Sequence, residues 1–283
     1  MRADGKKLRN ADPMYTVAAH IMNRRTDALN MVTIDLPIEP MQTYLNEKRK
    51  EGLNISHMAL LVSAYLRVVS EMPELNRFIV NKRAYAHNDF WLSMVVLKAG
   101  EAHDGTTSKF KLELTDTVFD VNRKIEDYIN ENRNAPQNNG TEKAIKVLLS
   151  VPGVLTLGVG LCRFLDKHGL LPKALIQASP FHNSLFISNL ASIRTNHIYH
   201  HCYDFGTTSI FITLGNLREV PRRVKGEVVF EKCLPLGVVM DERICSGSYF
   251  ATAFRRLRQY LKNPALLEQP PENVTLDPCV KRK

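Results

Sequence analysis

The feature that most constrains the fold is an apolar run at 234–240, which is broken only by one proline and one glycine. A short run of this kind, bounded by polar residues, predicts a buried strand. The charged triplet Asp241-Glu242-Arg243 and a turn of small residues follow, and an amphipathic helix is expected over 251–261. Strand, polar corner and helix in this order can hold side chains at the edge of a site, although spacing alone favours an ordinary connection.

Composition places the chain among ordinary globular proteins. Of its 283 residues, 44% are hydrophobic and 24% are charged, which suits one large domain or two small ones. No charged segment followed by an apolar one opens the sequence, so secretion is not indicated. Five scattered cysteines without a CxxC pair argue against a disulfide framework or structural zinc and favour the cytoplasm. The net charge of +9 suggests an anionic partner, either a phosphate-bearing small molecule, a membrane surface or, least of all, nucleic acid.

The order of predicted elements indicates an α/β sandwich with a largely mixed sheet. Helices are expected over Ser56–Glu71, with Ser56 as N-cap, and over 118–131. Short strands are expected between and after them, at 30–36, 78–80, 83–85, 90–98, 185–188, 208–214 and 228–230. Because these elements do not alternate regularly as βαβ units, a mixed sheet is favoured. We expect one domain over residues 14–268, a polar basic tail at 1–13 and another tail at 269–283.

One apolar segment, at 147–162, stands apart. Its sixteen residues are interrupted by a proline, a serine, a threonine and three glycines. A membrane-spanning helix needs about 20 apolar residues, so a buried or interfacial helix is favoured over a span. Weak peripheral contact with a membrane through this segment stays open.

Three local signals, in this order, resemble the chloramphenicol acetyltransferase-like superfamily. The resemblance is greatest to the catalytic domain of the dihydrolipoyl acyltransferases of 2-oxo acid dehydrogenase complexes. The segment Pro73-Glu74-Leu75-Asn76, at the end of the predicted helix, resembles the P-E-L-N of those domains. Phe186-Ile187-Ser188-Asn189-Leu190 is similar to their T-I-S-N-L strand, and the corner at 241–247 lies on their D-H-R-x-x-D-G signature. The resemblance runs from about Met14 to Glu268.

The resemblance implies a two-layer sandwich that assembles as a homotrimer, with an active-site channel between neighbouring subunits. A coenzyme A thioester would enter as co-substrate from one side and a small-molecule acceptor from the other. In the family, the signature histidine is the general base, and a serine or threonine hydroxyl hydrogen-bonds the oxyanion of the tetrahedral intermediate. Ser188 matches the oxyanion residue, and Asp241, Arg243 and Gly247 match the loop frame.

The base itself is replaced, because Glu242 stands at the signature histidine and Ser246 at the signature aspartate. A thiol with a pKa of about 8.5 lies about 2 units above a histidine but about 4 units above a glutamate. Proton transfer from the thiol to glutamate is therefore less favourable than transfer to histidine by roughly 3 kcal/mol, which corresponds to about a hundredfold in rate. Burial in an apolar channel would raise the pKa of Glu242, whereas a neighbouring Arg243 would lower it. Glu242 could therefore act as the general base of the reaction or form a structural salt bridge.

A loop after the strand at 185–188 offers other bases. It contains His197, His200 and His201, and the family's corresponding loop lies near the trimer interface, so His200 and His201 are candidates. Their spacing, with Asp204 nearby, also suggests metal, but no second cluster supports one and loop packing is the commoner role. Cys245 lies inside the signature loop, but without a basic partner it is expected to pack rather than to react.

Two functions follow. The first is a stand-alone acyltransferase that moves an acyl group from coenzyme A or a related thioester carrier to an unidentified acceptor. Ser188 would be its oxyanion donor, and Glu242 or a loop histidine its base. The second is a catalytically inactive trimeric relative that binds an acyl ligand or a partner protein, because both the histidine and the aspartate of the signature are lost.

Overall fold

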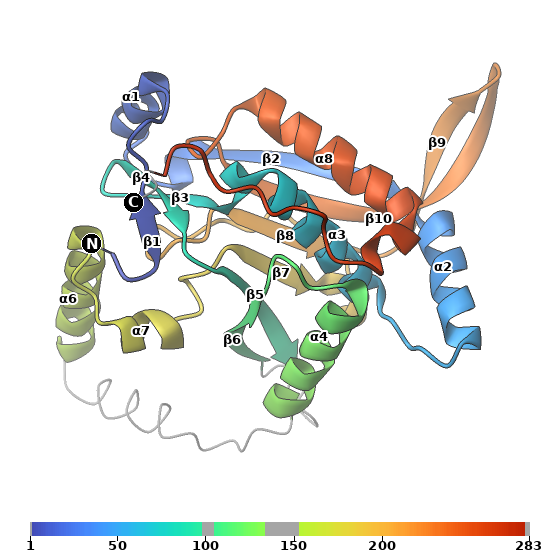
Figure 1. Cartoon of the computed structure of the whole chain (residues 1–283), viewed down its shortest axis with the longest axis horizontal. Coiled ribbons are helices and arrows are strands. Elements are labelled where there is room, and N and C mark those ends of the chain that lie inside the picture. The colour runs from blue at the N-terminus through green and yellow to red at the C-terminus, as the bar shows by residue number, and fades with distance from the viewer. Residues whose placement is uncertain (1, 98–104, 134–152, 281–283) are drawn as a thin grey trace.

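The fold is centred on a mixed seven-stranded sheet, with the strand order β2-β10-β8-β7-β5-β6 and β9 paired with the outer part of β10 (Figure 1). This computed structural model describes residues 2–97, 105–133 and 153–280. The β5–β7 and β7–β8 pairs are parallel and the other pairs are antiparallel. The strands are β2 (Leu29–Pro37), β5 (Phe90–Leu97), β6 (Gly105–Leu112), β7 (Leu185–Asn189), β8 (Ile210–Leu214), β9 (Arg218–Val224) and β10 (Glu227–Asp241).

Four helices cover one face of this sheet and share a single hydrophobic core with it (Figure 1). They are α2 (Ile38–Lys50), α3 (His57–Glu71), α4 (Val118–Arg133) and α8 (Gly247–Lys262). Every residue of α3 from Met58 to Ser70 is buried, as expected of a helix that is apolar on nearly all sides. Ser56 caps α3 by accepting from the backbone N–H of Ala59 at 3.0 Å, as the sequence predicts.

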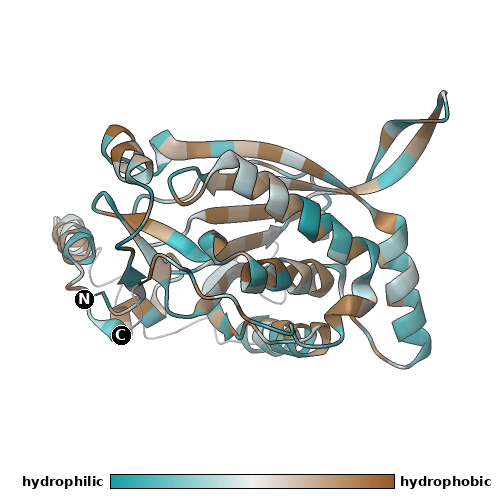
Figure 2. Cartoon of the chain, turned by 45° about the horizontal axis from the view of Figure 1, so that its top comes forward, coloured by the Kyte–Doolittle hydropathy of each residue, from teal (hydrophilic) through white to brown (hydrophobic). Residues whose placement is uncertain are grey.

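A second, three-stranded sheet has the order β1-β4-β3. It consists of β1 (Gly5–Lys7), β3 (Arg77–Val80) and β4 (Arg83–His87), so it includes residues that the sequence assigns to a tail. Three helices lie near this small sheet, namely α1 (Pro13–Ile21), α6 (Val154–His168) and α7 (Lys173–Ala178) (Figures 1 and 2). Short 3-10 turns are at Thr26–Ala28, Pro73–Asn76, Leu190–Ile193 and Pro264–Leu267.

Parts of both segments that the sequence assigns to tails pack onto the domain. At the N-terminal end, Arg2 is buried and β1 pairs with β4. At the C-terminal end, Asp277 is buried and accepts two hydrogen bonds from Arg77, at 2.5 and 2.9 Å. The hydrophilic composition of these segments hid this packing, because buried ion pairs and, for β1, strand pairing hold them to the domain.

The sheet presents two different faces because successive side chains of a strand point to opposite sides. In β7, Leu185 and Ile187 belong to the core under the helices, whereas Phe186 belongs to a second, smaller cluster on the other face. That cluster also contains Cys202, Phe211 and Val239. Ser188, two residues after Phe186, therefore lies on the helix-free face, and this face carries the candidate site.

Candidate active site

Ser188 begins a row of small residues that crosses four strands of the helix-free face. In the register of the sheet, Ser188 of β7 is opposite Thr213 of β8, Thr213 is opposite Gly237 of β10, and Gly237 is opposite Thr33 of β2. Ser188 is half-buried, whereas Thr213 is fully buried. The row forms a polar track on the sheet, with the predicted oxyanion serine at one end of it.

A loop lies directly on this track. The hydroxyl of Thr213 donates to the carbonyl oxygen of Ile198 at 2.6 Å and accepts from the Ile198 N–H at 3.2 Å. The approach needs glycine in the sheet, because a Cβ on Gly237 would come within 2.3 Å of the Ile198 carbonyl oxygen. A Cβ on Gly215 would likewise come within 2.2 Å of the backbone nitrogen of His197. The two glycines thus fix where the histidine loop crosses the sheet.

We expect Gly237→Ala to lower the free energy of unfolding by about 1–3 kcal/mol, because the added methyl group forces the backbone of the loop away from the sheet. The comparison variant is Gly247→Ala, where the added Cβ meets nothing within 4 Å and the residue starts α8. Urea unfolding of both variants measures the difference. A Gly237→Ala protein as stable as the wild type would show that the loop is not seated on the sheet.

Beyond this seat, the loop places His200 in a stack of aromatic rings. The ring of Phe211 is 4.5 Å from that of Phe186 and 4.2 Å from that of His200, and all three are close to parallel. Phe211 offers one face to each neighbour, so His200 lies on the side of Phe211 away from Phe186. His201 is exposed and stacks on His200 at 4.7 Å.

The hydrogen bonding of His200 defines its tautomer. Its Nδ1 lies 2.9 Å from the carbonyl oxygen of His201, and because a carbonyl oxygen only accepts, Nδ1 carries the proton. In the neutral ring Nε2 then holds the lone pair, and within the described part of the chain it has no hydrogen-bond partner. His200 is therefore prepared to accept a proton at Nε2.

His197 has a structural role. Its Nε2 lies 3.0 Å from the hydroxyl of Thr33, and the same hydroxyl is 2.6 Å from that of Tyr199. Burial and the nearby Arg218 lower the pKa of His197, although Asp35 acts in the opposite direction. The ring is thus neutral at pH 7 and is occupied in holding the loop to β2.

At the other end of β10, the signature corner is built on a buried charge cluster. The carboxylate of Asp241 is fully buried and accepts from Arg243 at 2.8 and 2.7 Å. Arg25, also buried, approaches the same carboxylate at 3.5 Å. Arg25 further donates to the carbonyl oxygens of Tyr203 and Gly206, so the cluster joins the corner to the end of the histidine loop. Burial lowers the pKa of Arg25, and Asp241 opposes this shift.

Glu242 itself is exposed. Its carboxylate accepts from the side-chain amide of Asn30 at 2.6 Å, and Arg243 is bound to Asp241 instead. No ion pair to Glu242 is found among the described residues. The arginine of the corner is therefore a structural partner of Asp241, not of Glu242.

The rest of the corner starts a helix. The hydroxyl of Ser246 accepts from the Tyr249 N–H at 3.2 Å and caps α8, and Gly247 is the first helical residue. Cys245 is fully buried in the main core, and burial raises the pKa of its thiol, which stays protonated. These contacts support the packing role predicted for Cys245.

Ser188 and Glu242 of one chain do not meet. Glu242 follows the end of β10, five residues beyond Gly237, and β10 is two strands away from β7. With about 3.3 Å per residue along a strand and about 4.8 Å between strands, the two residues are roughly 19 Å apart. A site that unites Ser188 with Glu242 thus needs a second copy of the chain.

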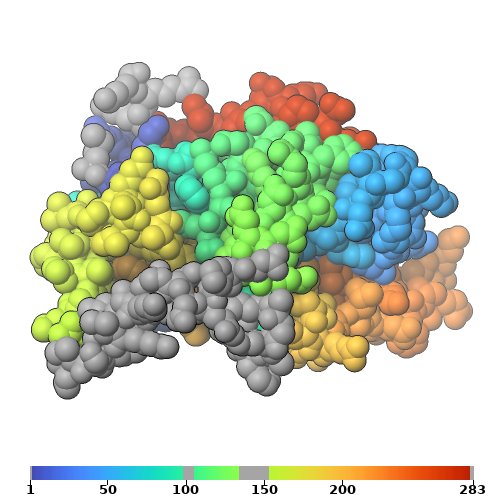
Figure 3. Space-filling view, turned by 90° about the horizontal axis from the view of Figure 1, so that it is seen from below, coloured from blue at the N-terminus to red at the C-terminus, as the bar shows by residue number. Residues whose placement is uncertain are grey.

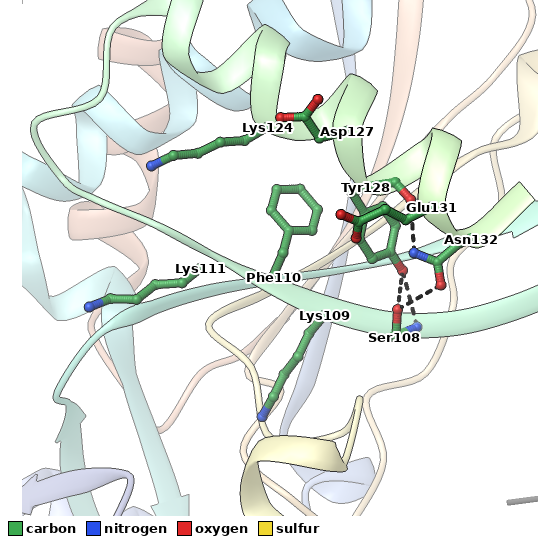
Figure 4. Close-up of a pocket in the computed structure, with 9 residues that line it drawn as sticks. All are labelled: Ser108, Lys109, Phe110, Lys111, Lys124, Asp127, Tyr128, Glu131 and Asn132. Atoms are coloured by element: carbon green, nitrogen blue, oxygen red, sulfur yellow. Dashed lines mark hydrogen bonds between the residues drawn. The ribbon is translucent and has the colours of Figure 1, made fainter. Parts of the chain in front are cut away.

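A surface cavity of about 450 Å³ lies elsewhere, between β6 and α4 (Figure 4). Phe110 and Tyr128 line it, and the Ser108 hydroxyl donates to that of Tyr128 at 2.9 Å. Phe110 packs against the helix-side core, so the cavity opens on the side of the sheet opposite to Ser188. It contains no residue that the sequence predicts for the site. The described residues also contain no group of three or more histidine, cysteine or acidic side chains placed to hold a metal.

No protein-family model and no curated protein matches the sequence. Among solved structures, the chain is similar to a probable dihydrolipoamide acetyltransferase from Listeria monocytogenes, with a TM-score of 0.57 and 12% identity over 91% of this chain and 94% of that one. It is also similar to a chloramphenicol acetyltransferase, with a TM-score of 0.52 and 12% identity over 90% of this chain and 100% of that one. This is the chloramphenicol acetyltransferase-like fold.

A third structure with the same fold is the dihydrolipoamide acetyltransferase of Azotobacter vinelandii. Its TM-score is 0.59, with 10% identity over 90% of this chain and 88% of that one. That structure comes from a study of the role of one serine, one histidine and one asparagine in the catalytic mechanism of the enzyme. The predicted fold class of an α/β sandwich with a mixed sheet is thus confirmed for this chain.

Several residues of the site were not found from the sequence. Arg25 precedes β2 by four residues, and nothing in its neighbourhood signals that it reaches Asp241. Thr33 and Tyr199 are far apart in the sequence, and their hydroxyls meet only because the loop crosses β2 in the folded chain. Thr213 offered the one readable signal, since it is a single polar residue in the apolar strand Ile210–Leu214.

Proposed function

We propose that this protein is an acyltransferase that moves an acyl group from coenzyme A or a related thioester carrier to a small-molecule acceptor. The observation that carries the proposal is the half-buried Ser188 at the end of a polar track, in a fold shared with acetyltransferases. The acceptor attacks the thioester carbonyl, a base takes its proton, and the Ser188 hydroxyl donates a hydrogen bond to the oxyanion. Collapse of the intermediate breaks the C–S bond, and the protonated base returns its proton to the departing sulfur, so the carrier leaves as a thiol.

The separation of Ser188 from Glu242 supports a site shared between copies, as in the trimer that the family resemblance implies. In this arrangement Ser188 of one subunit faces the base of its neighbour. We assign the base to His200, because its Nε2 holds a lone pair in the tautomer fixed by the His201 carbonyl. Glu242 is exposed and bound to the Asn30 amide, and it is the weaker candidate. The ordinary pKa of a carboxylate lies further from that of a thiol than the ordinary pKa of an imidazole does.

The direct test is the release of free thiol from a panel of acyl-coenzyme A thioesters with thiol, amine and hydroxyl acceptors. Turnover with at least one pair is the expected result. A catalytically inactive relative that binds an acyl ligand or partner protein is the second candidate, favoured by the loss of the signature histidine and aspartate. In that case coenzyme A raises the melting temperature, but no thioester is consumed.

Ser188→Ala is expected to lower kcat by about 10²–10³, because the oxyanion loses one preorganised donor. Ser192→Ala is the matched control. Its hydroxyl is exposed, four residues away in the next turn, and donates to the Asn189 carbonyl oxygen at 2.6 Å. Initial rates at saturating thioester measure both. Equal rates for Ser188→Ala and wild type would remove Ser188 from the mechanism.

A further inference from the structure

One helix, α6, is exposed on almost all sides. It forms part of one end of the molecule, together with α7 (Figure 3). Leu157, Leu161 and Phe164 are 75%, 58% and 56% exposed, respectively. Their spacing of four and three residues places them on one face of the helix, so α6 carries an outward apolar stripe. A single solvated leucine is ordinary, but a stripe of three on one helix marks a contact surface.

The opposite side of α6 is fastened to the domain through one buried carboxylate. Asp166, the only buried residue of α6, accepts from Arg2 at 2.6 Å and lies 3.3 Å from Nε2 of His182. Burial raises the pKa of Asp166, but its contacts with His182 and Arg2 outweigh this and hold the pKa below the ordinary value. Since Asp166 is two residues from Phe164, about 200° around the helix, this anchor turns the apolar stripe away from the body.

The exposed charges beside the stripe are all positive. Between residues 153 and 178, the acidic side chain is Asp166, which is buried and neutralised by Arg2. Arg163, Lys167 and Lys173 are exposed over the same range. A basic flank next to a Leu/Phe stripe is the pattern of helices that lie in the interface of anionic membranes. No described helix is both long and apolar enough to cross a bilayer.

We propose that α6 docks the protein on an anionic lipid surface, with Leu157, Leu161 and Phe164 inserted among the headgroups and Arg163 and Lys167 against lipid phosphates. The sequence predicts weak peripheral membrane contact through 147–162, and the stripe on α6 overlaps this range. Residues 147–152 lie outside the described residues, and the stripe extends to Phe164. The surface is separate from the Ser188 track and independent of acyl transfer.

The test is co-sedimentation of the full chain with vesicles of phosphatidylcholine alone and of phosphatidylcholine with phosphatidylglycerol. We expect binding to the mixed vesicles that weakens as salt is added. Leu157→Asn combined with Leu161→Asn should lower the partition coefficient by about tenfold or more, because two leucines no longer leave water. Thr156→Asn, an exposed position of the same helix outside the stripe, is the matched control and should change it by less than about twofold.

Charge is tested separately. Arg163→Gln and Lys167→Gln should each weaken binding to the mixed vesicles about fivefold and leave binding to neutral vesicles unchanged. Absence of binding to the mixed vesicles overturns the proposal. Sedimentation velocity of the lipid-free chain then shows whether the asparagine variants lose self-association, which would assign the stripe to a second copy. Vesicle binding needs no turnover, so the result does not depend on the proposed acyl transfer.

Discussion

Asp241→Ala is expected to lower the free energy of unfolding by about 3–5 kcal/mol, the cost of removing one partner from a buried ion pair. Asp241 is fully buried, and its two oxygens accept from Arg243 at 2.8 and 2.7 Å. Without it, the guanidinium groups of Arg243 and Arg25 stay buried beside carbonyl oxygens but lose the carboxylate that pairs with them. Urea unfolding at pH 7 measures the change.

The comparison is an exposed ion pair on the β9–β10 hairpin. Arg222 and Glu231 are 3.2 Å apart, and their side chains are 45% and 39% exposed. Glu231→Ala should therefore cost less than about 1 kcal/mol. If Asp241→Ala cost no more than this, water would have to reach both arginines, and the buried cluster would not hold the corner together.

The same variant reports on the histidine loop. Arg25 contacts Asp241 and also donates to the carbonyl oxygens of Tyr203 and Gly206, at the far end of the loop from its seat on Thr213. The loop is thus held at one end by the hydroxyls of Thr213 and Thr33 and at the other end by the guanidinium of Arg25. A change at the signature corner is expected to release the end held by Arg25 and to lower the order of His200 and His201 without touching either.

The sequence predicted those parts of the fold in which local signals and burial agree. Ser56 and Pro73 bound α3 as expected, because a cap and a proline define the ends of a helix whatever surrounds it. The strands predicted at 228–230 and 234–240 are both present, but as parts of one continuous strand, β10 (Glu227–Asp241). In contrast, β6 (Gly105–Leu112) was missed, since its lysines, serine and threonines alternate too weakly to mark a strand at the sheet edge.

The candidate site was less predictable because register creates it. Motif resemblance identified Ser188 and the corner, each on its own strand. That Ser188, Thr213, Gly237 and Thr33 form one row depends on pairings between strands far apart in sequence. The same register places Glu242 well away from Ser188, which local spacing cannot show. The pairing of Arg243 with Asp241 was equally hidden, because the sequence does not show which of the two neighbouring carboxylates the guanidinium faces.

His200→Phe is expected to lower kcat by about 10²–10⁴, the range for loss of a general base. Phenylalanine keeps an aromatic ring on Phe211, where the rings of residues 200 and 211 are 4.2 Å apart and 14° from parallel, and it carries no ring nitrogen. Loop packing is therefore nearly preserved while the proton acceptor is lost. Glu242→Gln, which keeps the hydrogen bond from Asn30 possible, should change kcat by less than about tenfold.

These two variants, measured as initial rates on the same thioester, separate the possible bases because each removes one proton acceptor and leaves the fold intact. Loss of activity in Glu242→Gln with full activity in His200→Phe would overturn the assignment and show that the carboxylate at the signature position has taken over the histidine's role. A melting temperature close to that of the wild type in both variants is the condition for this comparison. We expect both variants to melt close to the wild type. The ring at position 200 stays stacked, the carboxylate at position 242 is exposed, and neither substitution leaves a buried group unpaired.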